Sequence, residues 1–142
     1  MFCQIARREI NSHAVYEDDL IFAFLDIEPI RPGHTQVVPR AHYDYFDDLP
    51  IPIGSRIIEV SQRLAKAMKT AYSVPRVALL FTGGDIAHAH AHLVPMHEHT
   101  DITSRRYIAE EHLTFRSMPR ASPDALRQQA ALLIATLNGR AR

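Results

Sequence analysis

The sequence predicts an α+β fold, in which a mainly antiparallel sheet is combined with two main helices. Two observations support this class. Short apolar runs bounded by prolines, glycines and acidic residues recur along the first hundred residues, a pattern typical of strands joined by turns. Two longer segments, 54–72 and 122–139, instead carry helical apolar spacing or helix start and stop residues.

The first forty residues supply three of the expected strands. Residues 13–25 hold two apolar patches around the acidic run 17–19, which predicts a β-hairpin whose turn lies at the acidic residues. The segment 28–33 has two prolines and a glycine and is expected to be a loop. It leads into residues 34–39, whose β-branched side chains favour a strand that the final proline ends.

The middle of the chain predicts the longest helix and two further strands. Residues 54–72 place their apolar side chains on one helical face. Residues 76–82 are an apolar run of strand length, followed by turn residues. Residues 86–95 alternate strictly up to Pro95, and a period of two indicates a strand that carries its histidines on one face.

The C-terminal part has a less regular pattern. Residues 100–121 show no clear period and are expected to form a partly extended loop. Ser122, followed by proline and aspartate, is a helix-start signature, while Asn138 and Gly139 are stop signals. At 142 residues the chain has the usual length of one domain, so we expect a single domain over 1–142.

The composition argues against nucleic acid and membranes as binding partners. The 16 basic residues balance 16 acidic ones, so no global field favours nucleic acid or an anionic membrane. The first twenty residues are charged throughout and no run is long and apolar enough to cross a bilayer. The single cysteine, Cys3, cannot form an internal disulfide or a four-thiolate zinc site. We therefore expect a cytoplasmic protein that binds neither nucleic acid nor membrane.

Histidines mark the expected chemistry, because five of the nine lie between positions 88 and 99. On a straight strand His88, His90 and His92 would project from one face at intervals of roughly 6.5 Å. Such a row suits an extended substrate such as a chain of phosphates, and the middle residue is best placed to attack. A neutral imidazole has the lone pair that nucleophilic catalysis needs.

A metal site is the main alternative for these side chains. Zinc binds imidazole at about 2.0–2.1 Å, so a straight strand offers one ion two of the three histidines. The remaining ligands would then come from His97, His99 or His112. Solvated positions are the simpler interpretation of those three residues and of His13.

Two blocks of sequence resemble the histidine triad (HIT) superfamily of nucleotide hydrolases and transferases. The string HAHAHLVP, residues 88–95, resembles the triad signature. Residues 16–42 resemble the family's strand pair, its Asp-Ile corner and its His-x-x-x-x-Pro-basic-x-His segment. The resemblance covers roughly residues 1–100. It implies a HIT-like domain in which residues 100–142 are a variable C-terminal extension with a terminal helix.

The resemblance also implies roles for the four histidines. His90 corresponds to the nucleophile, which attacks the α-phosphate of a nucleotide and becomes nucleotidylated. His88 and His92 correspond to the flanking pair, the former supporting the site and the latter contacting phosphate oxygens. His34 corresponds to the fourth histidine near the same phosphates. His42 is expected to hold structure.

Further positions match the nucleoside site of the family. Asp26 matches the residue that holds the ribose hydroxyls, and a carboxylate does offer two acceptor oxygens to two vicinal hydroxyls. A turn-capping aspartate is an equally good interpretation. The residues that match the apolar slot for the base are Phe2, Ile5, Phe24 and Ile27. Core packing is the alternative for them and is favoured for Phe24.

Two departures from the family pattern stand out. Many relatives have Gly-Gln and a small hydroxyl residue ahead of the triad, whereas this chain has Gly84 and Asp85 in the segment 83–87. A carboxylate there would repel phosphate unless it turned away or found a cation. Some bacterial relatives also carry Cys-x-x-Cys as half of a structural zinc site. Only Cys3 matches here, so a structural zinc is not expected and no cofactor is required.

The sequence thus predicts a hydrolase or transferase acting at the α-phosphate of purine nucleotide conjugates, namely phosphoramidates, mixed anhydrides or dinucleoside polyphosphates. The family implies a homodimer with helix 54–72 at or near the interface. Two other functions stay open: a catalytically weak regulatory protein that binds nucleotides, and a His-rich metal-binding protein.

Overall fold

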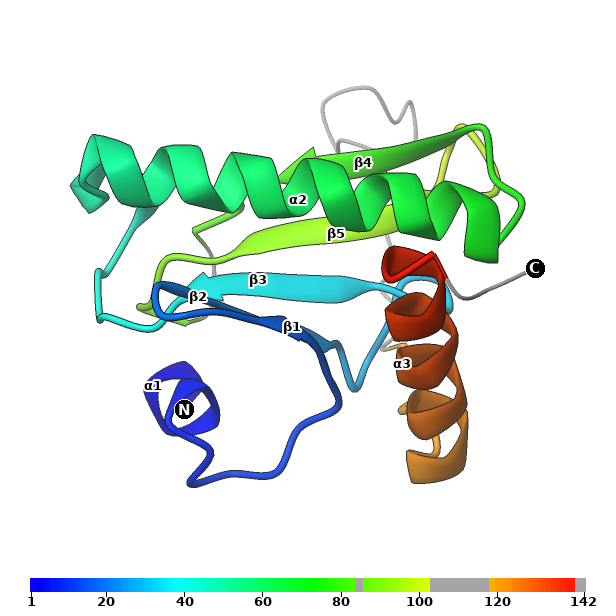
Figure 1. Cartoon of the computed structure of the whole chain (residues 1–142), viewed down its shortest axis with the longest axis horizontal. Coiled ribbons are helices and arrows are strands. Elements are labelled where there is room, and N and C mark those ends of the chain that lie inside the picture. Colours follow the sequence, from blue (N-terminus) through cyan, green and yellow to red (C-terminus); the bar gives the residue numbers. More distant parts are fainter. Residues whose placement is uncertain (84–85, 103–117, 140–142) are drawn as a thin grey trace, which may run out of the picture.

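A five-stranded antiparallel sheet forms the centre of the protein, in the strand order β1-β2-β3-β5-β4 (Figure 1). The computed structural model describes residues 1–83, 86–102 and 118–139. The strands are β1 (Ala14–Glu17), β2 (Ile21–Leu25), β3 (Thr35–Pro39), β4 (Arg76–Leu80) and β5 (Ala91–Met96). The helices are α1 (Phe2–Ala6), α2 (Ile51–Ala71) and α3 (Pro123–Leu137), with a short 3-10 turn η1 (Phe46–Asp48).

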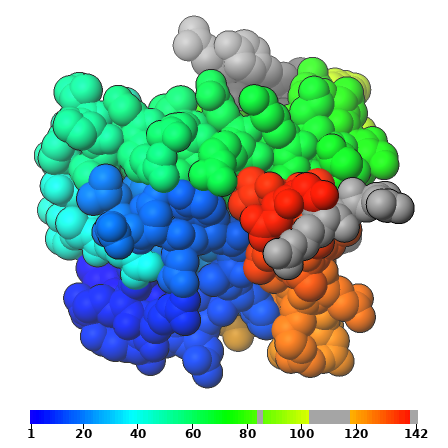
Figure 2. Space-filling view, in the orientation of Figure 1, coloured from blue at the N-terminus to red at the C-terminus, as the bar shows by residue number. Residues whose placement is uncertain are grey.

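Helices α2 and α3 pack together against one face of the sheet. In Figure 2 the C-terminal end of α3, in red, abuts α2, in green. The α+β class with a mainly antiparallel sheet and two main helices is therefore confirmed. Within the described residues, no helix is long and apolar enough to cross a membrane.

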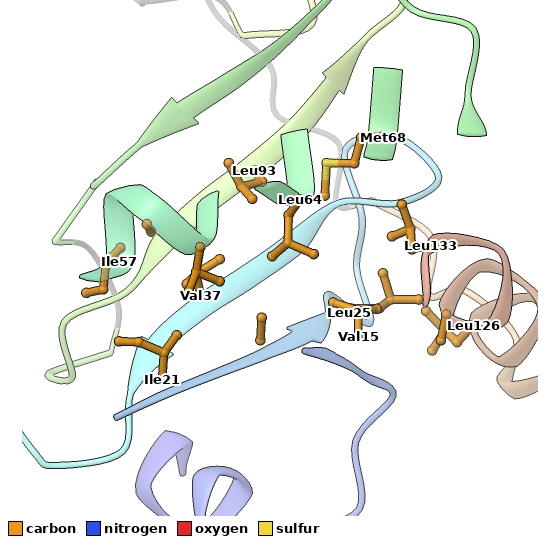
Figure 3. Close-up of a cluster of buried hydrophobic side chains, with 14 residues drawn as sticks. Val15, Ile21, Leu25, Val37, Ile57, Leu64, Met68, Leu93, Leu126 and Leu133 are labelled. Atoms are coloured by element: carbon orange, nitrogen blue, oxygen red, sulfur yellow. The ribbon is translucent and has the colours of Figure 1, made fainter. Parts of the chain in front are cut away.

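The main core lies between the sheet and these two helices, where its side chains converge (Figure 3). Because side chains alternate along a strand, Ile21 and Leu25 of β2 enter this core while Phe22 and Phe24 face the other side of the sheet. There they meet Phe2, Ile5, Ala6 and Val38 in a second apolar cluster. This second face carries the candidate site.

The hairpin and the two helices agree with the sequence prediction, with shifted ends. Asp18 closes the β1–β2 turn, since its Oδ1 accepts hydrogen bonds from the N–H groups of Leu20 and Ile21 at 2.8 and 2.7 Å. Helix α2 begins three residues before the predicted start at residue 54, with a proline in its first turn. Prolines punctuate loops but are also tolerated at a helix start. Helix α3 begins at the predicted cap, where Ser122 Oγ accepts from the Ala125 N–H.

The strand predicted over 86–95 is wrong in its first half, because β5 begins only at Ala91. The neighbouring strand β3 pairs with β5 from Thr35↔Leu93 to Val37↔Ala91, and the pairing stops there although β3 continues to Pro39. The Ala89 N–H instead donates to the Tyr43 carbonyl. Alternation therefore did not indicate a strand over residues 86–90, because they do not join the ladder between β3 and β5.

Other expected elements agree in part. The strand predicted over 76–82 ends at Leu80. Most of the loop expected over 100–121 lies outside the described residues, and the extent of the domain over 1–142 stays a prediction.

Candidate active site

The candidate site lies where the ends of several segments meet on the second face of the sheet. Asp26 follows β2 directly, His34 ends the loop that leads into β3, and His92 is the second residue of β5. Their ligand-type atoms all lie within 4.8 Å of one another. His88 and His90 stand in the irregular segment before β5, so the predicted row of three evenly spaced rings on one strand is wrong.

The local environment fixes the tautomer of the neutral His90 ring. Its Nδ1 lies 2.6 Å from the backbone carbonyl oxygen of His88. A carbonyl oxygen only accepts hydrogen bonds, so Nδ1 carries the hydrogen and Nε2 of the neutral ring keeps its lone pair. The ring is buried between Phe2 and His92, with centroids 5.1 and 5.0 Å away. His90 thus combines a fixed orientation with the tautomer that leaves the Nε2 lone pair free.

His34 and His92 form a hydrogen-bonded pair. The N–H of Ile30 donates to Nδ1 of His34 at 3.3 Å, so Nε2 of His34 carries the hydrogen. It donates to Nδ1 of His92 at 3.0 Å. Nε2 of His92 then carries a hydrogen and lies 3.3 Å from Thr82 Oγ1. His92 therefore presents an N–H donor near His90, the type of group that can stabilise charge on a phosphate oxygen.

Burial holds both of these rings neutral. It lowers the pKa of His34, an effect that the nearby Asp26 carboxylate opposes. Burial also lowers the pKa of His92 to about 4, and the neighbouring His34 and His90 add to that shift. At neutral pH the site therefore offers oriented neutral donors.

His88 has a structural position. Its Nε2–H donates to the Pro39 carbonyl oxygen at 3.0 Å, which ties the segment before β5 to the end of β3. Burial lowers its pKa. Its carbonyl oxygen holds His90, so His88 orients the candidate nucleophile through the backbone.

Asp26 fulfils the turn-capping role and keeps acceptor capacity as well. Its Oδ1 accepts the Glu28 N–H at 2.8 Å, which forms the turn after β2. Its Oδ2 accepts a hydrogen bond from Nε2 of Gln36 at 2.7 Å. Each carboxylate oxygen has a second lone pair for a ligand hydroxyl.

Gln36 is the residue that the sequence analysis missed. It pairs with His92 across β3 and β5 and is only 4% exposed. The available signal was a long amide side chain among the apolar residues of a predicted strand.

The residues expected at the base divide into two groups. Phe2, Ile5 and Phe24 are buried together in the second cluster, with the rings of Phe2 and Phe24 edge to face at 5.4 Å. Phe2 also touches His90, which links this cluster to the candidate nucleophile. Ile27 is 49% exposed and lies outside the cluster.

Three side chains beside the site have the chemistry of metal ligands. Cys3 Sγ lies 3.2 Å from Nδ1 of both His42 and His88, and those two nitrogens are 3.4 Å apart. The other nitrogen of each ring is bonded, to Asp44 and to the Pro39 carbonyl. A closed structural zinc site takes four protein ligands, and the described residues supply three here. These three side chains alone do not complete such a site. That the protein holds no structural zinc stays a prediction.

Other predicted positions are not placed. Gly84, Asp85 and His112 lie outside the described residues. His97 and His99 are exposed, on the loop that follows β5.

Comparisons with known proteins agree on one family. The HIT domain model matches residues 7–99. The chain is 34% identical over 96 residues to the adenosine 5'-monophosphoramidase of Saccharomyces cerevisiae, covering 67% of this chain and 61% of the yeast protein. It is 28% identical over 103 residues to an adenylylsulfatase of Arabidopsis thaliana, covering 69% of this chain and 52% of the plant protein.

A solved structure extends the likeness to almost the whole chain. A Hit-like protein involved in cell-cycle regulation from Bartonella henselae matches with a TM-score of 0.76 and 27% identity, covering 95% of this chain and 94% of that one.

Proposed function

The chain belongs to the HIT family, and from this premise we propose that it is a nucleotide hydrolase or transferase acting at the α-phosphate of purine nucleotide conjugates. The observation that carries the proposal is the bond from His90 Nδ1–H to the His88 carbonyl, which leaves Nε2 free to attack. The proposed substrates are phosphoramidates, mixed anhydrides or dinucleoside polyphosphates. Similarity to a monophosphoramidase and an adenylylsulfatase supports the first two classes.

The proposed reaction has two displacements at phosphorus. His90 Nε2 attacks the α-phosphorus, a bond from Nε2 to phosphorus forms, and the bond from phosphorus to the leaving group breaks. The leaving group departs with the bonding electrons and takes up a proton. Water then attacks the same phosphorus and loses a proton, the phosphorus–nitrogen bond breaks, and nucleoside monophosphate and neutral His90 result. Transfer to another acceptor replaces water in the second step.

The surrounding groups support this chemistry. The Nε2–H of His92 is the proposed donor to a nonbridging phosphate oxygen, and His34 fixes its orientation. The His88 carbonyl keeps a hydrogen-bond partner for Nδ1–H of His90 when the ring becomes positively charged in the intermediate. Asp26 is proposed to accept the ribose hydroxyls, and the cluster around Phe2 to contact the base.

Mass spectrometry tests the covalent mechanism. The protein is mixed briefly with an adenosine phosphoramidate and quenched in alkali, which preserves phosphohistidine. We expect an adenylyl adduct on His90 together with released AMP. A protein that binds AMP but gives neither adduct nor AMP would instead be the regulatory nucleotide binder. Stoichiometric zinc or copper retained through gel filtration, without AMP binding, would favour the metal-binding protein.

Replacement of His90 by Ala tests the same assignment by kinetics. We expect turnover to fall by at least about 10⁴-fold, since the nucleophile is lost, while AMP still binds. The control is His97→Ala, because His97 is exposed beyond the end of β5, and its turnover should match the wild type. Unchanged turnover in His90→Ala would rule out this nucleophile.

A further inference from the structure

Gln36 places a buried amide inside the candidate site. In the sheet it pairs with Phe24 on one side and with His92 on the other, so it stands between the aromatic cluster and the histidines. Side chains in register on neighbouring strands share a face. Gln36 is therefore buried on the face that holds Asp26 and His92, with only 4% of its surface exposed.

The Asp26 carboxylate fixes the orientation of this amide. Nε2 of Gln36 lies 2.7 Å from Asp26 Oδ2 and 3.0 Å from Nδ1 of His92. A carboxylate oxygen only accepts hydrogen bonds, so a flipped amide would set its oxygen against Asp26 and lose that bond. Nδ1 of His92 has a single lone pair, which already accepts from His34, so the contact of Gln36 with this nitrogen is secondary.

The amide oxygen of Gln36 has no partner. Oε1 is sealed from solvent, and no donor in the described parts of the chain reaches it. Buried polar atoms are nearly always hydrogen-bonded, and an exception calls for an explanation. Nε2 and Oε1 share one carbon, so this acceptor lies beside the nitrogen that donates to Asp26 Oδ2. A hydroxyl bound at Asp26 would be the adjacent donor.

We propose that Gln36 is a specificity residue whose Oε1 accepts a hydrogen bond from a ribose hydroxyl held at Asp26. This inference rests on the proposed nucleotide function and deepens it. Asp26 and Gln36 then form a two-residue acceptor for the vicinal diol, and the site selects ribonucleotides over deoxyribonucleotides. A site whose buried acceptor is left unpaired by the wrong ligand discriminates strongly against that ligand.

The test compares AMP with 2'-deoxy-AMP and 3'-deoxy-AMP by calorimetry, in the wild type and in Gln36→Met. Methionine keeps the length of the side chain and removes its hydrogen bonding. We expect the wild type to prefer AMP to at least one deoxy ligand by about tenfold, the equivalent of one good hydrogen bond. In Gln36→Met the affinity for AMP should fall by a similar factor while that deoxy ligand is little affected.

A matched control is Gln128→Met, because Gln128 is exposed on α3. It should keep the ribose preference. An equal loss of affinity for all three ligands in Gln36→Met would show that the substitution disturbs the site without removing a ribose contact, and would overturn the proposal. An unchanged preference in that variant would overturn it as well.

A second measurement does not depend on the folding of a variant. A crystal structure of the wild type with AMP should place a ribose hydroxyl oxygen within about 3.2 Å of Gln36 Oε1. A ribose bound elsewhere would refute the assignment. If the wild type binds AMP without ribose preference, only this inference fails. If it neither binds nor cleaves adenosine nucleotides, the proposed function fails with it.

Discussion

Each histidine of the candidate site owes its chemical character to one or two specific neighbours. His90 is a candidate nucleophile because a carbonyl oxygen fixes its hydrogen on Nδ1. His92 is a candidate donor because His34 occupies its Nδ1. The same residue type therefore has opposite hydrogen-bonding roles at positions two apart in the sequence.

The buried position of His92 predicts a pH-dependent loss of stability. Its pKa in the folded protein is lowered to about 4, against an ordinary value of 6.5. As pH falls below 6.5 the unfolded chain takes up a proton first, so this contribution is complete above 6.5 and is lost as pH falls towards 4. His92→Asn should therefore lose less stability than the wild type between pH 6.5 and 4.

Urea unfolding at several pH values measures this difference. The control is His97→Asn at the exposed loop position, which should follow the wild type. Parallel pH profiles for the wild type and His92→Asn would contradict the prediction, because they would mean that His92 titrates alike in both states.

At the scale of elements, the loop between β2 and β3 sets the distance between Asp26 and His34. The Asp26 N–H donates to the His34 carbonyl at 2.9 Å, so the two ends of the loop close on each other. Within it, Gly33 has a φ of +90° and its N–H donates to Gln129 Oε1 of α3 at 2.8 Å. Helix α3 thereby helps to hold a loop of the candidate site.

Gly33→Ala should destabilise the protein by about 3 kcal/mol, combining backbone strain with overpacking. A Cβ at this position would lie 2.3 Å from the Tyr72 ring. Gly139→Ala is the control, since its φ is +68° but no atom of the described residues lies within 4 Å of the added Cβ. It should cost about 1 kcal/mol, from backbone strain alone. Urea unfolding compares the two variants, and equal losses would show that contact with Tyr72 contributes nothing.

At the scale of the whole molecule, the sheet ends at β4, which is an edge strand of the described chain. Leu79 of β4 is 41% exposed, and Ile58 of α2 is 42% exposed. Edge strands with accessible apolar side chains are ready to pair with another chain. This arrangement suits the homodimer that the family resemblance implies, which remains a prediction.

Light scattering coupled to gel filtration tests the homodimer. We expect twice the mass of one chain, and we expect Leu79→Lys to shift the protein towards the monomer because it places a charge at the edge strand. The control is Leu132→Lys, an exposed position on α3, which should stay dimeric. A monomer at every concentration would contradict the family expectation, whereas a dimer unaffected by Leu79→Lys would locate the interface elsewhere.

The sequence by itself determined the elements whose signals are local. The acidic turn of the hairpin, the serine cap of α3 and the apolar face of α2 depend on residues close together in the chain, and each was predicted within a few residues. The two motif blocks also determined the family, because the order and spacing of their histidines are properties of the sequence alone.

Only the tertiary structure decided which groups of the candidate site form hydrogen bonds with one another. The start of β5 depends on where its pairing with β3 begins, and the position of the hydrogen on His90 depends on the His88 carbonyl in the irregular segment before β5. The contact between Gln36 and Asp26 joins two different segments of the chain. The Cys3–His42–His88 cluster likewise brings together residues that are far apart in the sequence. A linear pattern records which side chains are present. Packing between strands that are remote in the sequence sets which groups approach to hydrogen-bonding distance. It thereby also sets which atoms carry protons and which stay unpaired.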